Sequence, residues 1–147
     1  MSSASLLLWV VLLNLGVLPS PPTLDIQILL GSPRPQSNLT DKSYVSSEVK
    51  NVFVKHGLSY FYLLNEVTLT FSNKNPKAEV LTLPNQRLAQ FRYRGTGVRR
   101  HVFDFSLPDY NVEARLHAPT GRTFYQAGIR HPNGMVILKI RVRAPRK

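Results

Sequence analysis

The stretch MVILKIRVRAPRK, residues 135–147, decides the class of fold that the sequence predicts. From residue 136 to residue 143, one set of alternate positions is fully apolar, and the other set holds Ile137 and three cations. Successive side chains of a β-strand point to opposite faces, so Lys139, Arg141 and Arg143 share one face of the predicted strand. Like charges repel across a sheet, and an anion that covers them makes such a face favourable. The stretch therefore predicts an antiparallel sheet with one wet side and raises the hypothesis of an anionic partner.

The same two-residue period recurs upstream, between turns rich in Gly, Pro and Asn. The turns at residues 118–121 and 131–134 share the pattern x-P-x-G, which favours a type I turn followed by a bulge. Residues 87–143 thus predict five strands in one antiparallel meander, and the whole chain predicts an all-β fold, an antiparallel β-sandwich or partly open barrel. The other strand candidates are residues 58–64, 66–71, 78–84, 88–94, 100–108, 111–118 and 122–130. Residues 46–56 have the nearest approach to a helical period and are interpreted as a short helix or a short apolar strand.

Residues 1–20 predict a targeting segment, because Leu6–Leu18 is apolar except for Asn14. This run is shorter than the ~20 residues that span a bilayer, and it matches the apolar region of a signal peptide. A cleaved signal peptide places the domain in the endoplasmic reticulum lumen or outside the cell. An uncleaved signal-anchor keeps it in the cytosol, because the cations follow the apolar run. Asn38 opens an N-x-T sequon, which is a glycosylation site only in the lumenal case.

The remaining chain is divided by composition. Residues 21–42 are rich in proline and serine and predict a linker with a candidate edge strand, TLDIQILL. Residues 43–147 then make up the predicted β-sandwich domain. A domain of this length can bury a hydrophobic core without disulfides or metal ions. The chain has no cysteine, which excludes disulfides and thiolate metal sites.

The charge of the chain is uneven. The net charge is +11, and residues 85–147 hold thirteen of the nineteen Lys and Arg residues with three of the eight acidic residues. Eleven of these thirteen cations are arginine, whose planar fork binds phosphate, sulfate or carboxylate. A cationic half of this kind indicates an anionic partner.

The most specific basic element is RYRGTGVRR, residues 92–100, in which four arginines flank a predicted Gly-Thr-Gly tip. Glycines let backbone N–H groups approach an anion; the alternative is an ordinary hairpin with exposed arginines. If the meander forms one sheet, its cations share one surface, which either binds an anion or is a solvated face that blocks edge aggregation. The candidate anion-binding residues are Arg92, Arg94, Arg99, Arg100, Arg115, Lys139, Arg141 and Arg143.

Signals for an enzyme are missing from the sequence. The four histidines show no metal-ligand spacing, and no G-x-S-x-G nucleophile motif is present. We therefore expect no catalytic residues, no metal and no cofactor. The favoured hypothesis is a non-enzymatic binding module whose basic sheet face docks a sulfated glycan, a nucleic acid or an acidic protein surface. The alternative is a structural, assembly or viral accessory protein that is tethered to a membrane by Leu6–Leu18 and acts through β-edge contacts between subunits.

Overall fold

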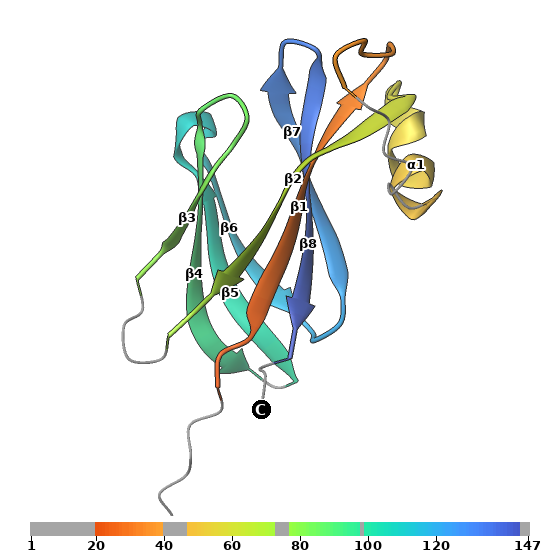
Figure 1. Ribbon diagram of the computed structural model, residues 1–147. Coiled ribbons are helices and arrows are strands. Elements are labelled where there is room, and N and C mark those ends of the chain that lie inside the picture. Colours follow the sequence, from red (N-terminus) through yellow and green to blue (C-terminus); the bar gives the residue numbers. More distant parts are fainter. Residues whose placement is uncertain (1–19, 40–46, 73–76, 98, 145–147) are drawn as a thin grey trace, which may run out of the picture.

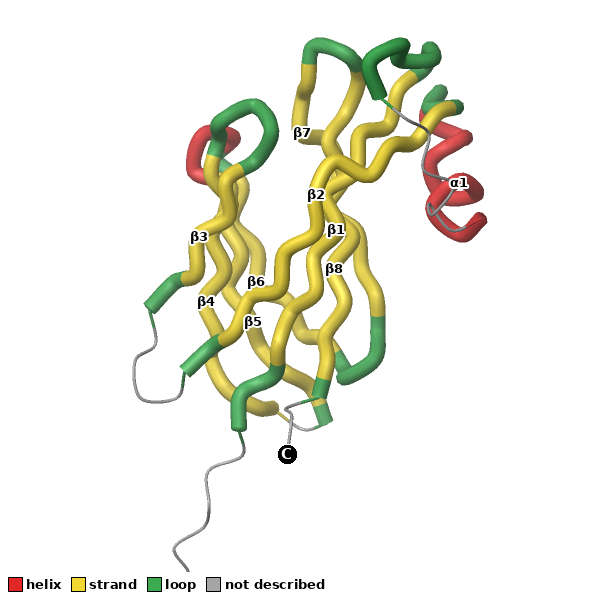
Figure 2. The backbone as a smooth tube through the Cα atoms, viewed as in Figure 1, coloured by secondary structure: helices red, strands yellow, loops and turns green. Residues whose placement is uncertain are grey.

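The computed structural model describes residues 20–39, 47–72, 77–97 and 99–144, which form two antiparallel four-stranded sheets (Figure 1). Sheet A has the order β2-β1-β8-β7, and sheet B has the order β3-β4-β5-β6. The fold is therefore the predicted β-sandwich, with strands as its main elements (Figure 2). The bounds of sheet A are β1 (Thr23–Ser32), β2 (Tyr60–Thr70), β7 (Thr123–His131) and β8 (Gly134–Arg143). Those of sheet B are β3 (Glu79–Thr82), β4 (Leu88–Gly97), β5 (Arg100–Leu107) and β6 (Val112–Ala118).

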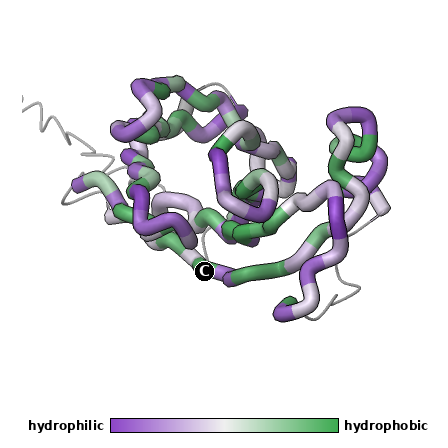
Figure 3. Tube along the Cα trace, turned by 90° about the horizontal axis from the view of Figure 1, so that it is seen from above, coloured by the Kyte–Doolittle hydropathy of each residue, from purple (hydrophilic) through white to green (hydrophobic). Residues whose placement is uncertain are grey.

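The main core lies between the two sheets and follows from the two-residue period. Phe91, Phe103 and Phe105 of sheet B are at most 2% exposed and meet the inner aliphatic side chains of β1 and β8. The rings of Phe91 and Phe105 pack with centroids 5.0 Å apart. Burial of each such ring contributes about 1.5–3 kcal/mol. Viewed from above the strand ends, hydrophobic and hydrophilic residues alternate along the chain (Figure 3).

The predicted five-strand meander is wrong at one connection. Strands β4, β5 and β6 follow one another in sheet B, but the turn after β6 carries the chain across to sheet A. There the N–H of Gly121 donates to the carbonyl of Val142 at 2.7 Å, and the N–H of Val142 donates to the carbonyl of Arg122 at 3.2 Å. The chain leaving this turn is therefore bonded to β8 rather than to β6, and the last two strands form a separate hairpin in sheet A.

Strand β1 is an interior strand and not the edge strand that composition suggested. It pairs with β2 on one side and with β8 on the other, so the sandwich begins at Thr23 rather than at residue 43. Leu24, Ile26 and Ile28 face the core, whereas Leu29 lies on the outer face of sheet A. The apolar end of TLDIQILL thus reflects burial on both faces of the sheet.

A second apolar cluster covers the upper part of that outer face. Residues 46–56 were interpreted as either helix or strand, and the described part is helical: α1 (Ser47–Phe53) continues into the 3-10 helix η1 (Val54–His56). Val49 and Phe53 of α1 pack on Leu29, Phe61 and other outer residues of sheet A. No helix in the four described ranges is long and apolar enough to cross a membrane, and Leu6–Leu18 lies outside those ranges.

Candidate anion-binding surface

The structure divides the eight candidate cations among three places. One group lies on the outer face of sheet B, a second lies on the outer face of sheet A, and Arg99 and Arg100 lie at the β4–β5 hairpin. The outer faces of a sandwich point away from each other. The expectation of a single cationic sheet surface is therefore wrong, because the chain changes sheet between β6 and β7.

On sheet B, Asp104 and Glu113 offset two of the three positive charges of the basic group. Asp104 of β5 is the ladder neighbour of Arg92 on β4 and of Arg115 on β6. Its carboxylate accepts a hydrogen bond from Nε of Arg115 at 2.9 Å and is also ion-paired with Arg94. The hydrogen bonds from Arg115 and then Arg94 lower the pKa of Asp104 below its usual value. A cavity of about 490 Å³ is lined by these charges and by Glu113, which leaves this face only weakly cationic.

On sheet A, the row of cations on β8 meets polar and acidic neighbours. Lys139 lies opposite Gln27 on β1, and Arg141 lies opposite Asp25. Asp25 accepts a hydrogen bond from Nη2 of Arg143 at 2.8 Å. The like charges are thus spaced along one strand and do not face one another across the ladder. This explains how the fold tolerates three cations at strand spacing without a bound anion.

A third group gathers at one end of the sandwich. The antiparallel strands bring the β4–β5 hairpin, the β6–β7 turn, the end of β8 and the start of β1 to the same end, at the bottom of Figure 1. Nε2 of His101 and Oγ1 of Thr120 are hydrogen-bonded at 3.1 Å, which joins the hairpin to the turn. We call this region the basic end and define it by Arg99, Arg100, Arg122 and Arg143.

The arginines of the two turns are free at the basic end. Arg99, Arg100 and Arg122 are all exposed. Within the part of the chain that the structure describes, none of their guanidinium groups is hydrogen-bonded or ion-paired. Arg143 is the exception, since it is paired with Asp25. The basic end therefore presents forked donors that are available to an external anion.

The predicted Gly-Thr-Gly tip is not a tip. Thr96 and Gly97 are paired with β5, opposite His101 and Arg100, so the chain reverses between Gly97 and Arg100. Gly95 lies beside a bulge with a φ of 116°. Because Thr96 and Gly97 belong to the ladder, these residues do not form the predicted cradle of free N–H groups.

Arg122 belongs to the basic end but was not among the candidates. The sequence held a signal for it, because turns of an antiparallel fold alternate between the two ends of the molecule. The connection between β4 and β5 and the turn between β6 and β7 are separated by two strands and therefore share an end. The number of strands between two turns predicts whether they share an end, whichever sheet each strand joins.

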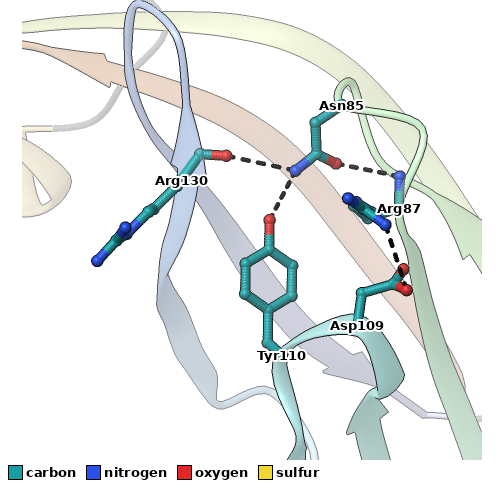
Figure 4. A network of polar contacts seen from close by, with 5 residues as sticks. All are labelled: Asn85, Arg87, Asp109, Tyr110 and Arg130. Atoms are coloured by element: carbon teal, nitrogen blue, oxygen red, sulfur yellow. Dashed lines mark hydrogen bonds and ion pairs between the residues drawn. The ribbon is translucent and has the colours of Figure 1, made fainter.

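At the opposite end, polar contacts join the two sheets (Figure 4). Nδ2 of Asn85 donates to the hydroxyl of Tyr110 at 2.8 Å and to the carbonyl of Arg130 at 3.3 Å. Arg87 forms an ion pair with Asp109 at 3.4 Å. At this end the β3–β4 turn is thus hydrogen-bonded to β7, and the charge of Arg87 is neutralised by Asp109.

The remaining predicted features can be placed briefly. Asn38 is exposed beyond β1, while Thr40 of its sequon lies outside the described residues. Among the residues that the structure describes, no three His, Cys, Asp or Glu side chains are grouped to hold a metal ion. Burial lowers the pKa of His101 below its ordinary value of 6.5, which favours the neutral ring between Tyr93 and Thr120.

The fold and this surface define an all-β sandwich with a cluster of free arginines at one end. No family model, curated protein or solved structure matches the chain.

Proposed function

We propose that the chain is a non-enzymatic binding module that docks an anionic partner through its basic end. The observation that carries this proposal is the group formed by Arg99, Arg100 and Arg122. These three arginines come from two turns at one end and have no partner among the described residues. Carboxylates occupy other cations: Asp104 pairs with Arg94 and Arg115 on sheet B, and Asp25 pairs with Arg143, the fourth arginine of the basic end.

The proposed mechanism is counterion release combined with forked contacts from arginine. Each guanidinium group offers planar paired donors that match phosphate, sulfate or carboxylate. The His101–Thr120 hydrogen bond holds the two turns together, so the backbone loses less conformational entropy when an anion binds. Affinity should therefore fall steeply as salt is added.

Three of the four edge strands favour this proposal over assembly through β-edges. The edges are β2 and β7 in sheet A and β3 and β6 in sheet B. Strand β3 has only four residues, β7 is interrupted by a bulge between Gln126 and Ile129, and β6 exposes Glu113 and Arg115. Short, bulged or charged edges are the features by which proteins discourage edge pairing.

The test compares two triple variants of equal charge. The first replaces Arg99, Arg100 and Arg122 by Gln, and the control replaces three exposed cations away from the basic end, Arg34, Lys55 and Arg130. Duplex DNA serves as a polyanion of known charge density, because log Kobs falls with log salt by about 0.9 for each phosphate contact. We expect the first variant to lower that slope by about 2.7 and the control to leave it unchanged.

Retention of each variant on heparin checks the same proposal with a sulfated polymer. We expect the first variant to elute at lower salt than the parent chain, and the control to elute with the parent chain. Equal weakening by both variants would mean that net charge alone causes binding. That result, or binding that is indifferent to salt, would refute a role for the basic end.

A further inference from the structure

We propose that the anionic partner is the headgroup layer of an anionic lipid bilayer, into which the chain's own apolar run Leu6–Leu18 inserts. This inference rests on the proposed function and names its partner. The observation behind it is a juxtaposition. The basic end is also the end at which β1 begins, since Thr23 of β1 is the ladder neighbour of Arg143 on β8.

Chain connectivity keeps the apolar run close to the basic end. Only residues 19–22 separate Leu18 from Thr23. A fully extended chain covers at most about 3.6 Å per residue, so Leu18 lies within roughly 18 Å of Thr23. The sequence after β8 adds Arg146 and Lys147, which follow Arg143 and lie outside the described residues. The apolar run is therefore joined to the domain at the end that carries the basic residues.

Two weak membrane signals placed together give stable attachment. The apolar run has thirteen residues, fewer than the ~20 that span a bilayer. A single apolar anchor of modest size binds reversibly, and a polybasic patch beside it makes the attachment stable. Near an anionic leaflet, each Lys or Arg strengthens binding by roughly fivefold. A soluble polyanion also fits the arginines, but it gives no reason for the apolar run to share their end.

The geometry fixes how the domain stands on the bilayer. Strand β1 has ten residues, and a strand of that length extends for about 33 Å. Electrostatic screening at physiological ionic strength acts over about 8 Å. When the domain stands on its basic end, cations at the far end do not sense the headgroups. The same control cations, Arg34, Lys55 and Arg130, therefore distinguish an upright domain from one that lies on a sheet face.

The experiment measures how the full chain partitions onto vesicles of phosphatidylcholine alone and of phosphatidylcholine with 30% phosphatidylserine. Trp9 is the only tryptophan of the chain and lies within the apolar run, so a blue shift of its emission reports insertion. We expect the anionic vesicles to bind the chain more tightly and to shift Trp9. Replacing Arg99, Arg100 and Arg122 by Gln should reduce partition onto the anionic vesicles by roughly a hundredfold. The same change should have no effect on the neutral vesicles, and the control triple should behave like the parent chain.

A variant of the apolar run tests the second signal. Leu7→Asp/Leu12→Asp should abolish the Trp9 shift and weaken binding to both kinds of vesicle, while retention on heparin stays unchanged.

The results separate this inference from the proposed function. If the arginine triple loses heparin retention while serine lipid makes no difference to vesicle binding, the bilayer is the wrong partner and the proposed function stands. Equal loss of anionic-vesicle binding in both triples would overturn the upright orientation. Heparin retention that is unchanged in the arginine triple would instead refute the proposed function itself.

Expression in secreting cells gives an independent check. We expect residues 1–19 to remain on the chain and Asn38 to stay unmodified, because a run too short to span the bilayer inserts without carrying the domain across it. A chain that begins after residue 19 and shifts on glycosidase treatment would overturn the inference.

Discussion

Two turns of this protein have the same sequence pattern, and alanine in place of their glycines should have unequal effects. The turns at 118–121 and 131–134 both end in glycine, and both glycines have positive φ: 80° at Gly121 and 151° at Gly134. A Cβ added at Gly121 would meet nothing within 4 Å. A Cβ added at Gly134 would lie 2.0 Å from the backbone carbonyl oxygen of Gly31.

The size of the difference follows from this contact. Real Cβ atoms essentially never lie closer than 3.0 Å to such an atom, so Gly134→Ala must move β8 away from β1 by about 1 Å. Both variants carry the cost of a left-handed backbone conformation, about 1–2 kcal/mol. Gly134→Ala adds the cost of forcing two packed strands apart, about 1–3 kcal/mol. We therefore expect losses in the free energy of unfolding of about 1–2 kcal/mol for Gly121→Ala and about 2–5 kcal/mol for Gly134→Ala.

Urea unfolding followed by far-ultraviolet circular dichroism measures both values, provided that the dependence on urea is the same in the two variants. Gly121→Ala is the matched control, because it changes the same turn position without the contact to Gly31. Equal losses in the two variants would refute the reasoning, since they would show that backbone conformation alone decides the outcome.

Three further perturbations test other parts of the structure. Asn85→Ala removes the bonds to Tyr110 and to β7, so it should lower the free energy of unfolding by about 1–2 kcal/mol, measured in urea, without changing heparin retention. Burial lowers the pKa of His101 below 6.5, so its contribution to stability is present above that pH and is lost as the pH falls. His101→Gln should flatten this acid-side slope in urea titrations at several pH values, and an unchanged slope would contradict this assignment. Phe53→Ala should cost about 3–5 kcal/mol and speed hydrogen exchange in α1 more than in β4 and β5; a uniform increase would argue against a separately packed helix.

Sequence periodicity predicted the strands but not their partners. The alternation that buries Phe103, Phe105 and Leu107 is local, so it can be read from the chain. The choice of sheet is not local: the turn after β6 resembles the turn before β8, yet only the first changes sheet. The interior position of β1 likewise depends on pairing with β8, more than a hundred residues later.

In the candidate site, too, the local features could be predicted from the sequence and the non-local contacts could not. The outward positions of Arg92 and Arg94 follow from their alternation with buried Phe91 and Tyr93. The pairing of Arg94 with Asp104 depends on the register of the hairpin, which contains a bulge between Tyr93 and Gly95. A bulge shifts which residues face each other, and the sequence did not reveal it.

The positions of the acidic residues make the distribution of charge differ between the two ends of the folded molecule. Residues 85–147 contain three acids, and all of them lie away from the basic end. Asp104 occupies the middle of sheet B, Asp109 pairs with Arg87 at the far end, and Glu113 is next to the first residue of β6 at that same far end. Arg99, Arg100 and Arg122 therefore have no acidic residue of this half beside them, unlike Arg87, Arg94 and Arg115, which are ion-paired. A field that is directed along the strands steers an anionic surface toward one end and orients the domain before any contact forms. The same net charge distributed over both sheet faces would attract an anion equally well but would select no orientation. The two matched triple variants therefore distinguish binding through the basic end from binding through net charge alone.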